Sequence, residues 1–321
     1  MFSGIGAFRK ALINLEIPYR IVGISEIDKF AIKSYEAMYG RTRNYGDISE
    51  VEKLDYADLW TYGFPCQDIS QAGKQAGIIK GKTRSGLLYE VERLLEKSLE
   101  SNESPKYLIM ENVKALVGKK FRLDFNRWVW RLNELGYYTW YKVINAADYG
   151  IPQKRERVIA VSIRKDLHQQ FKFPSPIPLK FSFRDALEEH PDSKYFLSNE
   201  MYRFCTERDQ YCKFHNLGYR FTPFERESCE IAKTITTKEG QRIVSNFIRE
   251  EVKTLDKSNV RRLTPKECFR LMGFSDSDYE KAHSVCSDTQ LYKQAGNSIV
   301  VGVIEAILKQ LLCQGVNEEH R

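Results

Sequence analysis

Cys66 is the residue of this sequence best placed for covalent chemistry. It stands in Gly63-Phe-Pro-Cys-Gln67, directly after Leu59–Tyr62, a short apolar run that predicts a strand. Ligands of open α/β sheets bind beyond the carboxyl ends of the strands, and a thiolate there can attack an electrophilic carbon. The alternative is a buried, inert cysteine, the commoner fate of a lone Cys. The polar run rich in Gly and Ser that follows favours the reactive cysteine.

A carboxylate and a group of basic side chains are predicted at the ends of other strands. Glu111-Asn-Val113 follows the predicted strand Tyr107–Met110, and Gln153-Lys-Arg-Glu-Arg157 directly precedes the predicted strand Val158–Ile163. An acid at a strand end is usually a cap or a salt-bridge partner, and a basic run is usually a solvated edge. Neither motif establishes a function by itself.

The sequence begins with a glycine-rich turn that could bind a ligand. Phe2-Ser-Gly-Ile-Gly6 precedes a predicted helix, Ala7–Leu15. Glycine lets a ligand approach the backbone closely, and a helix N-terminus offers free amide groups. Glu26 ends the next predicted strand, at a suitable distance to bind ribose hydroxyls. The dinucleotide fingerprint needs a third glycine where this chain has Arg9, so NAD binding is not indicated, and such a turn alone is more often structural.

These motifs need a sheet that brings strand ends together, and the first half of the chain predicts one. Apolar runs alternate with amphipathic segments, which indicates an α/β fold: a doubly wound, mostly parallel sheet with helices on both faces. The predicted strands are Tyr19–Ile24, Leu59–Tyr62, Tyr107–Met110, Thr139–Asn145 and Val158–Ile163. The predicted helices are Ala7–Leu15, Lys29–Tyr39, Leu87–Leu99 and Phe121–Leu135. The last two strands suggest a hairpin at the sheet edge.

Proline divides the chain into predicted domains. Phe173-Pro-Ser-Pro-Ile-Pro178 cannot continue a helix or a central strand. We predict a first domain over 1–173, which carries the motifs above, and a smaller irregular domain over 174–258. A return segment over 259–321 completes the first domain. It contains the predicted helices Lys266–Met272, with Thr264-Pro265 at its start, and Ser298–Leu312.

The composition is that of a basic, reduced protein. Lys and Arg number 50 against 43 Asp and Glu, a net charge of +7, which suits a polyanionic partner. The seven cysteines form no C-x-x-C pair, which indicates a reducing compartment. The longest apolar runs, such as Ile299–Ile304, are too short to cross a membrane, and no leader precedes Phe2, so we expect a cytoplasmic protein.

We expect no bound metal. Four potential ligands fall in the second half of the chain, but their spacing matches none of the familiar zinc patterns. They are Cys205, Cys212, His215 and Cys229.

Taken together, six motifs resemble the ordered signature of the bacterial and phage C5-cytosine DNA methyltransferases. They are Phe2-Ser-Gly-Ile-Gly6, Gly63-Phe-Pro-Cys-Gln67, Glu111-Asn-Val113, Gln153-Lys-Arg-Glu-Arg157, Arg262-Leu-Thr-Pro265 and Gln294-Ala-Gly-Asn-Ser298. The resemblance covers nearly the whole chain, and only about Pro174–Ser258 lacks family motifs. It implies the S-adenosylmethionine-dependent methyltransferase fold, a catalytic and cofactor-binding domain over 1–173 and a target-recognition domain over 174–258.

The resemblance implies a site for S-adenosylmethionine. Glu26 is expected at the ribose, Ile27 against the adenine and Asp47 at the adenine amino group, and Leu87 is expected to close the pocket. The implied cofactor residues are Phe2, Gly4, Gly6, Glu26, Ile27, Asp47, Ile48, Pro65, Leu87, Asn297 and Ser298. The last two lie far along the chain, which explains why the return segment must rejoin the first domain.

The implied reaction is methyl transfer to C5 of cytosine. Cys66 adds to C6, and Glu111 holds N3 and the exocyclic amine. Arg155 and Arg157 are expected either to favour the thiolate or to support the loops. The implied catalytic residues are Cys66, Gln67, Glu111, Arg155 and Arg157.

The implied substrate is duplex DNA, from which the target base must be flipped. The loop after Cys66 is expected to close over the DNA, although a floppy surface loop is the plainer interpretation. Expected DNA contacts are Lys82, Arg84, Gln153, Thr234 and Arg242. A cognate restriction endonuclease is a possible partner, and a monomer is expected.

The sequence departs from the family pattern at its start. Family members begin with a strand ahead of the glycine-rich turn, whereas this sequence starts at Met1-Phe2. We therefore expect the first strand to be missing and the chain to be less stable and less active than one with that strand. Two alternatives stay open: a tRNA cytosine-C5 methyltransferase, whose own Cys-Phe-Thr element is not found here, and an inactive DNA-binding homologue.

Overall fold

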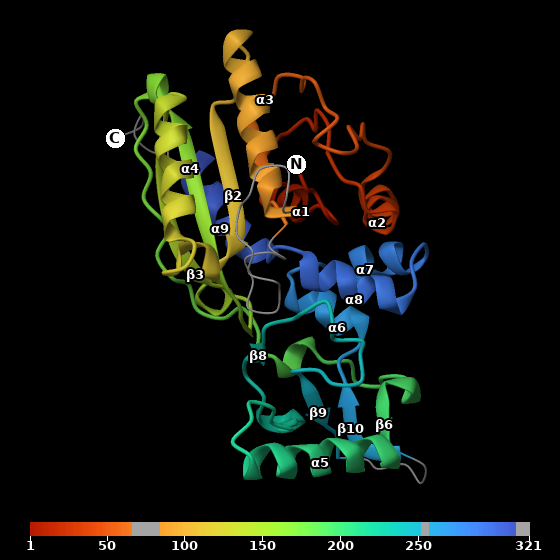
Figure 1. Ribbon diagram of the computed structural model, residues 1–321. Coiled ribbons are helices and arrows are strands. Elements are labelled where there is room, and N and C mark those ends of the chain that lie inside the picture. Colours follow the sequence, from red (N-terminus) through yellow and green to blue (C-terminus); the bar gives the residue numbers. More distant parts are fainter. Residues whose placement is uncertain (66–83, 252–256, 313–321) are drawn as a thin grey trace, which may run out of the picture. The chain divides into compact units, whose positions relative to one another are not determined.

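The computed structural model describes residues 1–65, 84–251 and 257–312, and it divides into two compact units (Figure 1). Unit 1 comprises Met1–Asn145, Glu156–Pro176 and Val303–Arg321, and unit 2 comprises Ala146–Arg155 and Ile177–Gly302. The predicted return segment, 259–321, is thus shared between the units. The domain boundaries at 173 and 258 remain predictions.

Unit 1 contains a four-stranded sheet in the order β1-β2-β5-β3. Its strands are β1 (Leu59–Tyr62), β2 (Tyr107–Val113), β3 (Tyr137–Asn145) and β5 (Glu156–Arg164). The pairing of β1 with β2 is parallel, whereas β2–β5 and β3–β5 are antiparallel. The predicted hairpin at the sheet edge is confirmed, and because of it the described sheet is mixed rather than mostly parallel.

Helices cover both faces of this sheet. Helices α3 (Leu88–Glu100) and α4 (Arg122–Glu134) pack on one face, and α9 (Val301–Leu312) lies behind the sheet in Figure 1. On α3 the residues Leu88, Val91, Leu94 and Leu95 repeat every three or four positions, so one helix face is apolar and buried. The N-terminal part adds α1 (Ala7–Asn14) and α2 (Lys29–Tyr39).

The prediction of a strand over Tyr19–Ile24 is wrong. In this segment only Ile24 forms a bridge, opposite Asn44. Its amide donates to the Arg43 carbonyl at 2.9 Å, and its carbonyl accepts from the Tyr45 amide at 2.8 Å. A strand needs a neighbour along its length to pair its amides and carbonyls. Among the described residues the segment has such a neighbour at one position, so it stays extended but irregular.

Unit 2 contains two small sheets of short strands and four α-helices among its described residues. One sheet has the order β6-β10-β9-β7, and β4 pairs with β8. The strands are β4 (Gln153–Lys154), β6 (Phe196–Ser198), β7 (Phe224–Glu225), β8 (Ala232–Lys233), β9 (Phe247–Arg249) and β10 (Lys257–Arg262). The helices are α5 (Asn199–Phe214), α6 (Pro265–Leu271), α7 (Asp276–His283) and α8 (Asp288–Asn297). The predicted cap of α6 is confirmed, because Thr264 and Glu267 form a capping box.

The 16-residue helix α5 was not predicted from the sequence. Its buried positions are Cys205, Asp209 and Cys212, while Phe204 and Phe214 are exposed. The buried face of α5 is therefore formed by two cysteines and an aspartate rather than by large apolar residues, and two of its aromatic side chains lie on the outside. Without an apolar stripe, the periodicity on which helix prediction depends is absent.

One segment has the length and composition of a membrane span. Asp288–Leu312 contains a window with a mean hydropathy of 1.4, but 56% of that window is buried inside the protein. Ser298 interrupts the helical segment between α8 and α9. Burial of this kind is typical of core helices.

The packing of α3 gives a stability prediction. Leu95 is fully buried in the core cluster that α3 and α4 form with the sheet, so Leu95→Ala should lower the free energy of unfolding by about 2–5 kcal/mol. Leu123 lies on α4 and is 71% exposed, so Leu123→Ala should change it by less than about 0.5 kcal/mol. Urea denaturation measures both. Equal losses would show that Leu95 is not a core residue.

Candidate functional site

The glycine-rich turn has the backbone that its sequence suggests. Phe2, Gly4 and Gly6 have φ angles of 55°, 52° and 81°, and Gly6 is the N-cap of α1. A Cβ at Gly4 would meet no atom within 4 Å, whereas one at Gly6 would lie 2.7 Å from Tyr35 Cε2. Gly4 therefore leaves open space beside the backbone, and Gly6 allows close packing against α2.

Glu26 holds this turn from the other side. Its Oε2 accepts a hydrogen bond from the Gly4 amide at 2.8 Å, and its Oε1 accepts from the amides of Ile27 and Asp28, each at 2.9 Å. Asn44 Nδ2 donates to the Glu26 carbonyl at 3.0 Å. The carboxylate is thus fixed beside the open face of the turn, where it can accept hydrogen bonds from hydroxyl groups.

Other predicted cofactor residues in unit 1 differ in exposure. Asp47 Oδ1 accepts from the Ser49 hydroxyl and amide, which lowers the pKa of Asp47 and keeps it an ionised acceptor. Ile27 is 69% exposed and offers an apolar surface. Ile48 is a core residue, so its side chain supports the site rather than lining it. Leu87 packs partly buried against the same core.

The chain that leads to the predicted nucleophile is tied to β2. Asn112 Nδ2 donates to the Phe64 carbonyl at 3.0 Å, and the Ser85 hydroxyl donates to the Pro65 carbonyl at 2.8 Å. Phe64 is buried. Cys66 and Gln67 lie outside the described residues. The backbone up to Pro65 is therefore anchored immediately before Cys66.

Glu111 lies next to that backbone. A Cβ added to Gly63 would be 3.7 Å from Glu111 Oε2, an ordinary contact distance, so the carboxyl group lies directly beside this backbone. Arg157 on β5 forms an ion pair with Glu111, with 3.2 Å between Nε and Oε1, and both side chains are mostly buried. Glu111 and Arg157 thus meet beside the end of β1, a pairing that the sequence did not predict.

Arg155 and Gln153 belong to unit 2 and bind backbone there. The Arg155 guanidinium donates to the carbonyls of Ile235, Gly296 and Ser298 at 2.8, 3.1 and 2.8 Å. These contacts fit the loop-supporting alternative for Arg155. Gln153 is completely buried: its Oε1 accepts from the Ile235 amide, and its Nε2 donates to the Leu271 carbonyl. The groove contact predicted for Gln153 is therefore not retained.

The remaining predicted residues of unit 2 lie on two segments. Asn297 is exposed at the end of α8, and Ser298 is buried. The Thr234 hydroxyl donates to the Lys154 carbonyl at 2.6 Å, and Arg242 is exposed and lines an open pocket of 490 Å³. Of the two basic residues predicted from the loop after Cys66, Arg84 begins the short helical turn η1 (Arg84–Leu87), and Lys82 lies outside the described residues.

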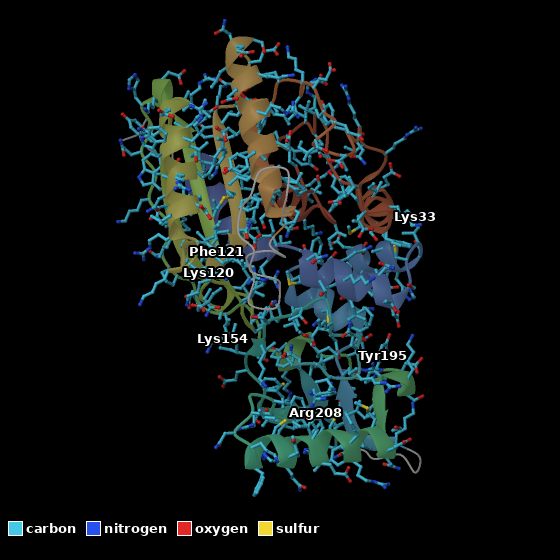
Figure 2. All side chains as sticks on the ribbon, in the orientation of Figure 1. Lys33, Lys120, Phe121, Lys154, Tyr195 and Arg208 are labelled. Carbon is cyan, nitrogen blue, oxygen red and sulfur yellow. The ribbon has the colours of Figure 1, made fainter. Side chains whose placement is uncertain are left out.

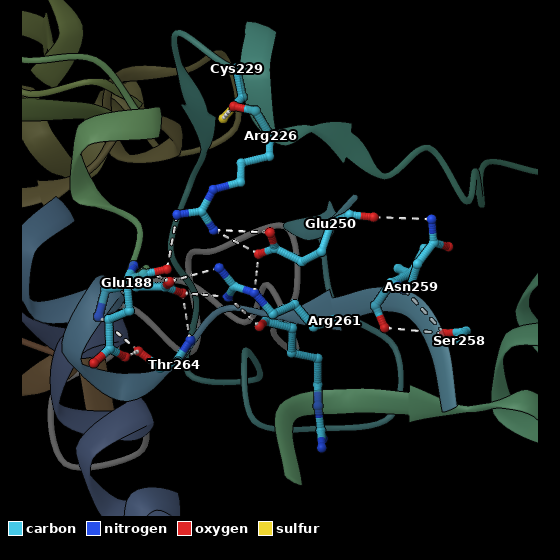
Figure 3. Close-up of polar contacts among 11 residues, drawn as sticks. Glu188, Arg226, Cys229, Glu250, Ser258, Asn259, Arg261 and Thr264 are labelled. Carbon is cyan, nitrogen blue, oxygen red and sulfur yellow. Dashed lines mark hydrogen bonds and ion pairs between the residues drawn. The ribbon is translucent and has the colours of Figure 1, made fainter. Parts of the chain in front are cut away.

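A buried ionic network, which sequence reasoning missed, connects segments of unit 2 (Figure 3). The fully buried Arg261 forms ion pairs with Glu250 and Glu267, at 2.6 and 2.9 Å. Arg226 also pairs with Glu250, at 2.8 Å. Buried charges of this kind are costly unless every member is paired. The only signal in the sequence was the capping-box spacing of Thr264 and Glu267, which does not reveal the arginine partner.

In the described part of the chain, no group of three or more His, Cys, Asp or Glu side chains could hold a metal ion. Cys205, Cys212 and Cys229 are buried free cysteines. Burial raises the pKa values of Cys205 and Cys229, which opposes their ionisation.

Sequence comparison gives consistent relatives over nearly the whole chain. The family model for C-5 cytosine-specific DNA methylase matches residues 1–313. The type II methyltransferase M2.ScrFI of Lactococcus lactis subsp. cremoris is 35% identical, over 97% of this chain and 97% of the relative. The type II methyltransferase M.NlaX of Neisseria lactamica is 34% identical, over 97% of this chain and 94% of the relative.

Solved structures share the fold. The S. pombe Dnmt2 methyltransferase has a TM-score of 0.72 at 20% identity, covering 98% of this chain and 97% of that chain. The Entamoeba histolytica methyltransferase EhMeth has a TM-score of 0.71 at 18% identity, covering 97% and 95%. At such low identity the likeness shows the fold alone, and it confirms the predicted α/β methyltransferase fold.

The segment that follows Thr234 gives a prediction about pH. Glu239 is completely buried, and burial raises its pKa to about 7. The folded protein therefore holds a proton that the unfolded chain loses near pH 4.5, so stability should fall as pH rises from about 4.5 to 7. Glu239→Gln should remove this dependence and be more stable than the unaltered protein at pH 8, by at most about 3 kcal/mol.

Thermal unfolding at pH 5, 6, 7 and 8 tests this expectation, and Glu230→Gln, at an exposed position of the same unit, is the control. A difference between Glu239→Gln and the unaltered protein that stays constant from pH 5 to pH 8 would contradict it.

Proposed function

Because the chain belongs to the family of C-5 cytosine-specific DNA methylases, we propose that Cys66 attacks C6 of a flipped cytosine in a specific duplex DNA sequence and that S-adenosylmethionine donates the methyl group to C5. The observation that carries this proposal is the position of Glu111. Its carboxyl group lies 3.7 Å from where a Gly63 Cβ would stand, three residues before Cys66 along an anchored backbone. A pyrimidine at this edge can meet a thiolate and a carboxyl group together.

The chemistry follows from the two groups. The Cys66 thiolate forms a bond to C6, and the electrons of the C5–C6 double bond move into the ring, where protonation of N3 by Glu111 relieves the charge. C5 then has the character of an enamine carbon and takes the methyl group. Water takes the C5 proton, the C5–C6 double bond forms again as the thiolate leaves C6, and the N3 proton returns to Glu111.

The residues of the glycine-rich turn suit S-adenosylmethionine, which supplies a sulfonium methyl group as the electrophile when bound. Glu26 offers an acceptor for ribose hydroxyls beside the open space at Gly4. Asp47 stays ionised and can accept from the adenine amine, and Ile27 offers its exposed apolar side chain to the ring. Support from Phe2, Pro65, Leu87, Asn297 and Ser298 remains part of the proposal.

Two arginines have different proposed roles. Arg157 holds Glu111 through the 3.2 Å ion pair and so orients the carboxyl group toward the base. Arg155 binds the carbonyls of Ile235, Gly296 and Ser298. It therefore holds the segment after Thr234 against the end of α8, where the proposed cofactor residues Asn297 and Ser298 lie. Gln67 is proposed to assist next to the nucleophile.

Binding of DNA is proposed to use the excess of positive charge, a net +7. Lys82 and Arg84 would contact the phosphate backbone. Thr234 and Arg242, which belong to the predicted recognition domain 174–258, would lie near a groove of the DNA. Arg242 is exposed and suited to reading base edges. The relatives named as type II methyltransferases favour a role beside a restriction endonuclease. A cytoplasmic location and a monomeric enzyme are further parts of the proposal.

A tRNA substrate is the alternative, and a transfer assay separates the two. With labelled S-adenosylmethionine, the enzyme should methylate unmodified duplex DNA and not tRNA. Cys66→Ala should abolish transfer, and Glu111→Gln should lower kcat by about 10²–10³-fold because charge on the ring is no longer relieved. Glu100→Gln, an exposed change on α3, should leave kcat unaltered.

Transfer to tRNA alone would overturn the proposed substrate. Transfer by Cys66→Ala at an undiminished rate would overturn the proposed nucleophile. Sequencing of the methylated positions in DNA from a host that expresses the enzyme identifies the recognised sequence.

A further inference from the structure

Arg9 is a positively charged residue in the first turn of helix α1. It is the third residue of α1, whose first turn contains no acidic side chain. The positive end of the helix dipole lies there, so a positive charge at this position is unfavourable for the isolated helix. Contacts with the rest of unit 1 must offset that cost, and the guanidinium makes four hydrogen bonds there.

The Arg9 guanidinium is enclosed by three tyrosines. Its nitrogens donate to the hydroxyls of Tyr19, Tyr35 and Thr42 at 3.3, 3.4 and 3.1 Å, and to the Tyr39 carbonyl at 3.2 Å. Its central carbon lies 5.8, 5.6 and 5.0 Å from the ring centroids of Tyr19, Tyr35 and Tyr39. The planar cation therefore combines directed hydrogen bonds with cation–π contacts.

Two of these tyrosines touch the glycine-rich turn. A Cβ on Gly6 would lie 2.7 Å from Tyr35 Cε2 and 2.8 Å from Tyr39 Cε2, and the Tyr39 hydroxyl donates to the Gly6 carbonyl at 3.4 Å. The two rings pack edge to face with centroids 5.0 Å apart, and Tyr35 is buried. The position of Gly6 is therefore set by the two rings that Arg9 holds.

We propose that Arg9 is a positioning residue for the cofactor turn: by fixing Tyr35 and Tyr39 against Gly6, it sets the affinity of the enzyme for S-adenosylmethionine. Glu26 fixes the turn at Gly4, through the 2.8 Å hydrogen bond, and the tyrosine pair fixes it two residues later. The turn is thus restrained on both sides of its open face. This inference rests on the proposed cofactor site.

Loss of the guanidinium should affect binding rather than chemistry. Without Arg9 the two rings can move, and the turn samples conformations that bind the cofactor less well, so part of the binding free energy is needed to order it. The hydrogen-bond partners of Arg9 among the described residues are Tyr19, Tyr35, Tyr39 and Thr42, and none of them is a proposed catalytic residue. The rate at saturating cofactor should therefore stay the same.

Isothermal calorimetry of the full chain with S-adenosylmethionine and with S-adenosylhomocysteine tests the inference without any turnover. Arg9→Met should weaken both affinities by about tenfold, equivalent to about 1.4 kcal/mol. The kcat at saturating cofactor and the KM for DNA should stay within about twofold. Arg9→Lys should rescue binding only in part, because an ammonium cannot reproduce the fork of donors.

Lys33→Met is the matched control, because it removes the same charge from an exposed position of α2 (Figure 2). If Arg9→Met does not fold, Tyr35→Phe and Tyr39→Phe, which each remove one hydroxyl and keep the rings, should weaken binding by about threefold. Unchanged affinity in the folded Arg9 variant, or in both tyrosine variants, would overturn the inference alone. Absence of cofactor binding by the unaltered enzyme would instead refute the proposed function together with it.

Discussion

The parallel pairing of β1 with β2 is the constraint on which the proposed chemistry depends. Tyr62, the last residue of β1, pairs with Met110, and β2 continues in the same direction to Val113, so both chains run toward the same edge of the sheet. The chain after β1 leads to Cys66, and β2 carries Glu111 one residue beyond Met110. The hydrogen bond from Asn112 to the Phe64 carbonyl then holds the first chain against the second. The register between β1 and β2 therefore determines where the proposed reaction takes place.

Both units position loops by means of charged groups that bind backbone or each other. The Arg155 guanidinium donates hydrogen bonds to three backbone carbonyls, and the Glu26 carboxylate accepts hydrogen bonds from three backbone amides. A charge satisfied by several backbone groups fixes a loop more firmly than a single neutral hydrogen bond, since charge-assisted bonds are stronger. Loops held in this way lose little entropy when a ligand binds, which suits sites that must be ordered beforehand.

The sequence predicted best those elements whose periodicity is carried by apolar residues. Leu59–Tyr62 and Lys29–Tyr39 form their elements with the predicted bounds, because apolar spacing specifies both the element and its buried face. Helix α5 was missed because its buried positions are Cys205, Asp209 and Cys212. The strand over Tyr19–Ile24 was wrong because composition alone does not supply a pairing partner.

In the candidate site, too, the sequence predicted some residue positions and missed others. Glu111 was expected at the same edge of the sheet as the segment after β1, although β2 continues beyond the predicted end at Met110 to Val113. The burial of Gln153 was not expected, because an amide side chain just before a strand is usually interpreted as exposed. Its partners, the Ile235 amide and the Leu271 carbonyl, are known only from the structure. These partners are distant in sequence and close only in the folded unit. Long-range hydrogen bonds of this kind leave no local pattern.

The most direct test of the central claim is to trap the bond between Cys66 and the base. Duplex DNA made with 5-fluorocytosine in place of cytosine has no C5 proton to lose, so the adduct cannot be released after methyl transfer. Mass spectrometry of the digested complex should locate a methylated fluorocytosine on the peptide that contains Cys66, and Cys66→Ala should give none. An adduct on another cysteine, or methylated DNA without any covalent complex, would contradict the account.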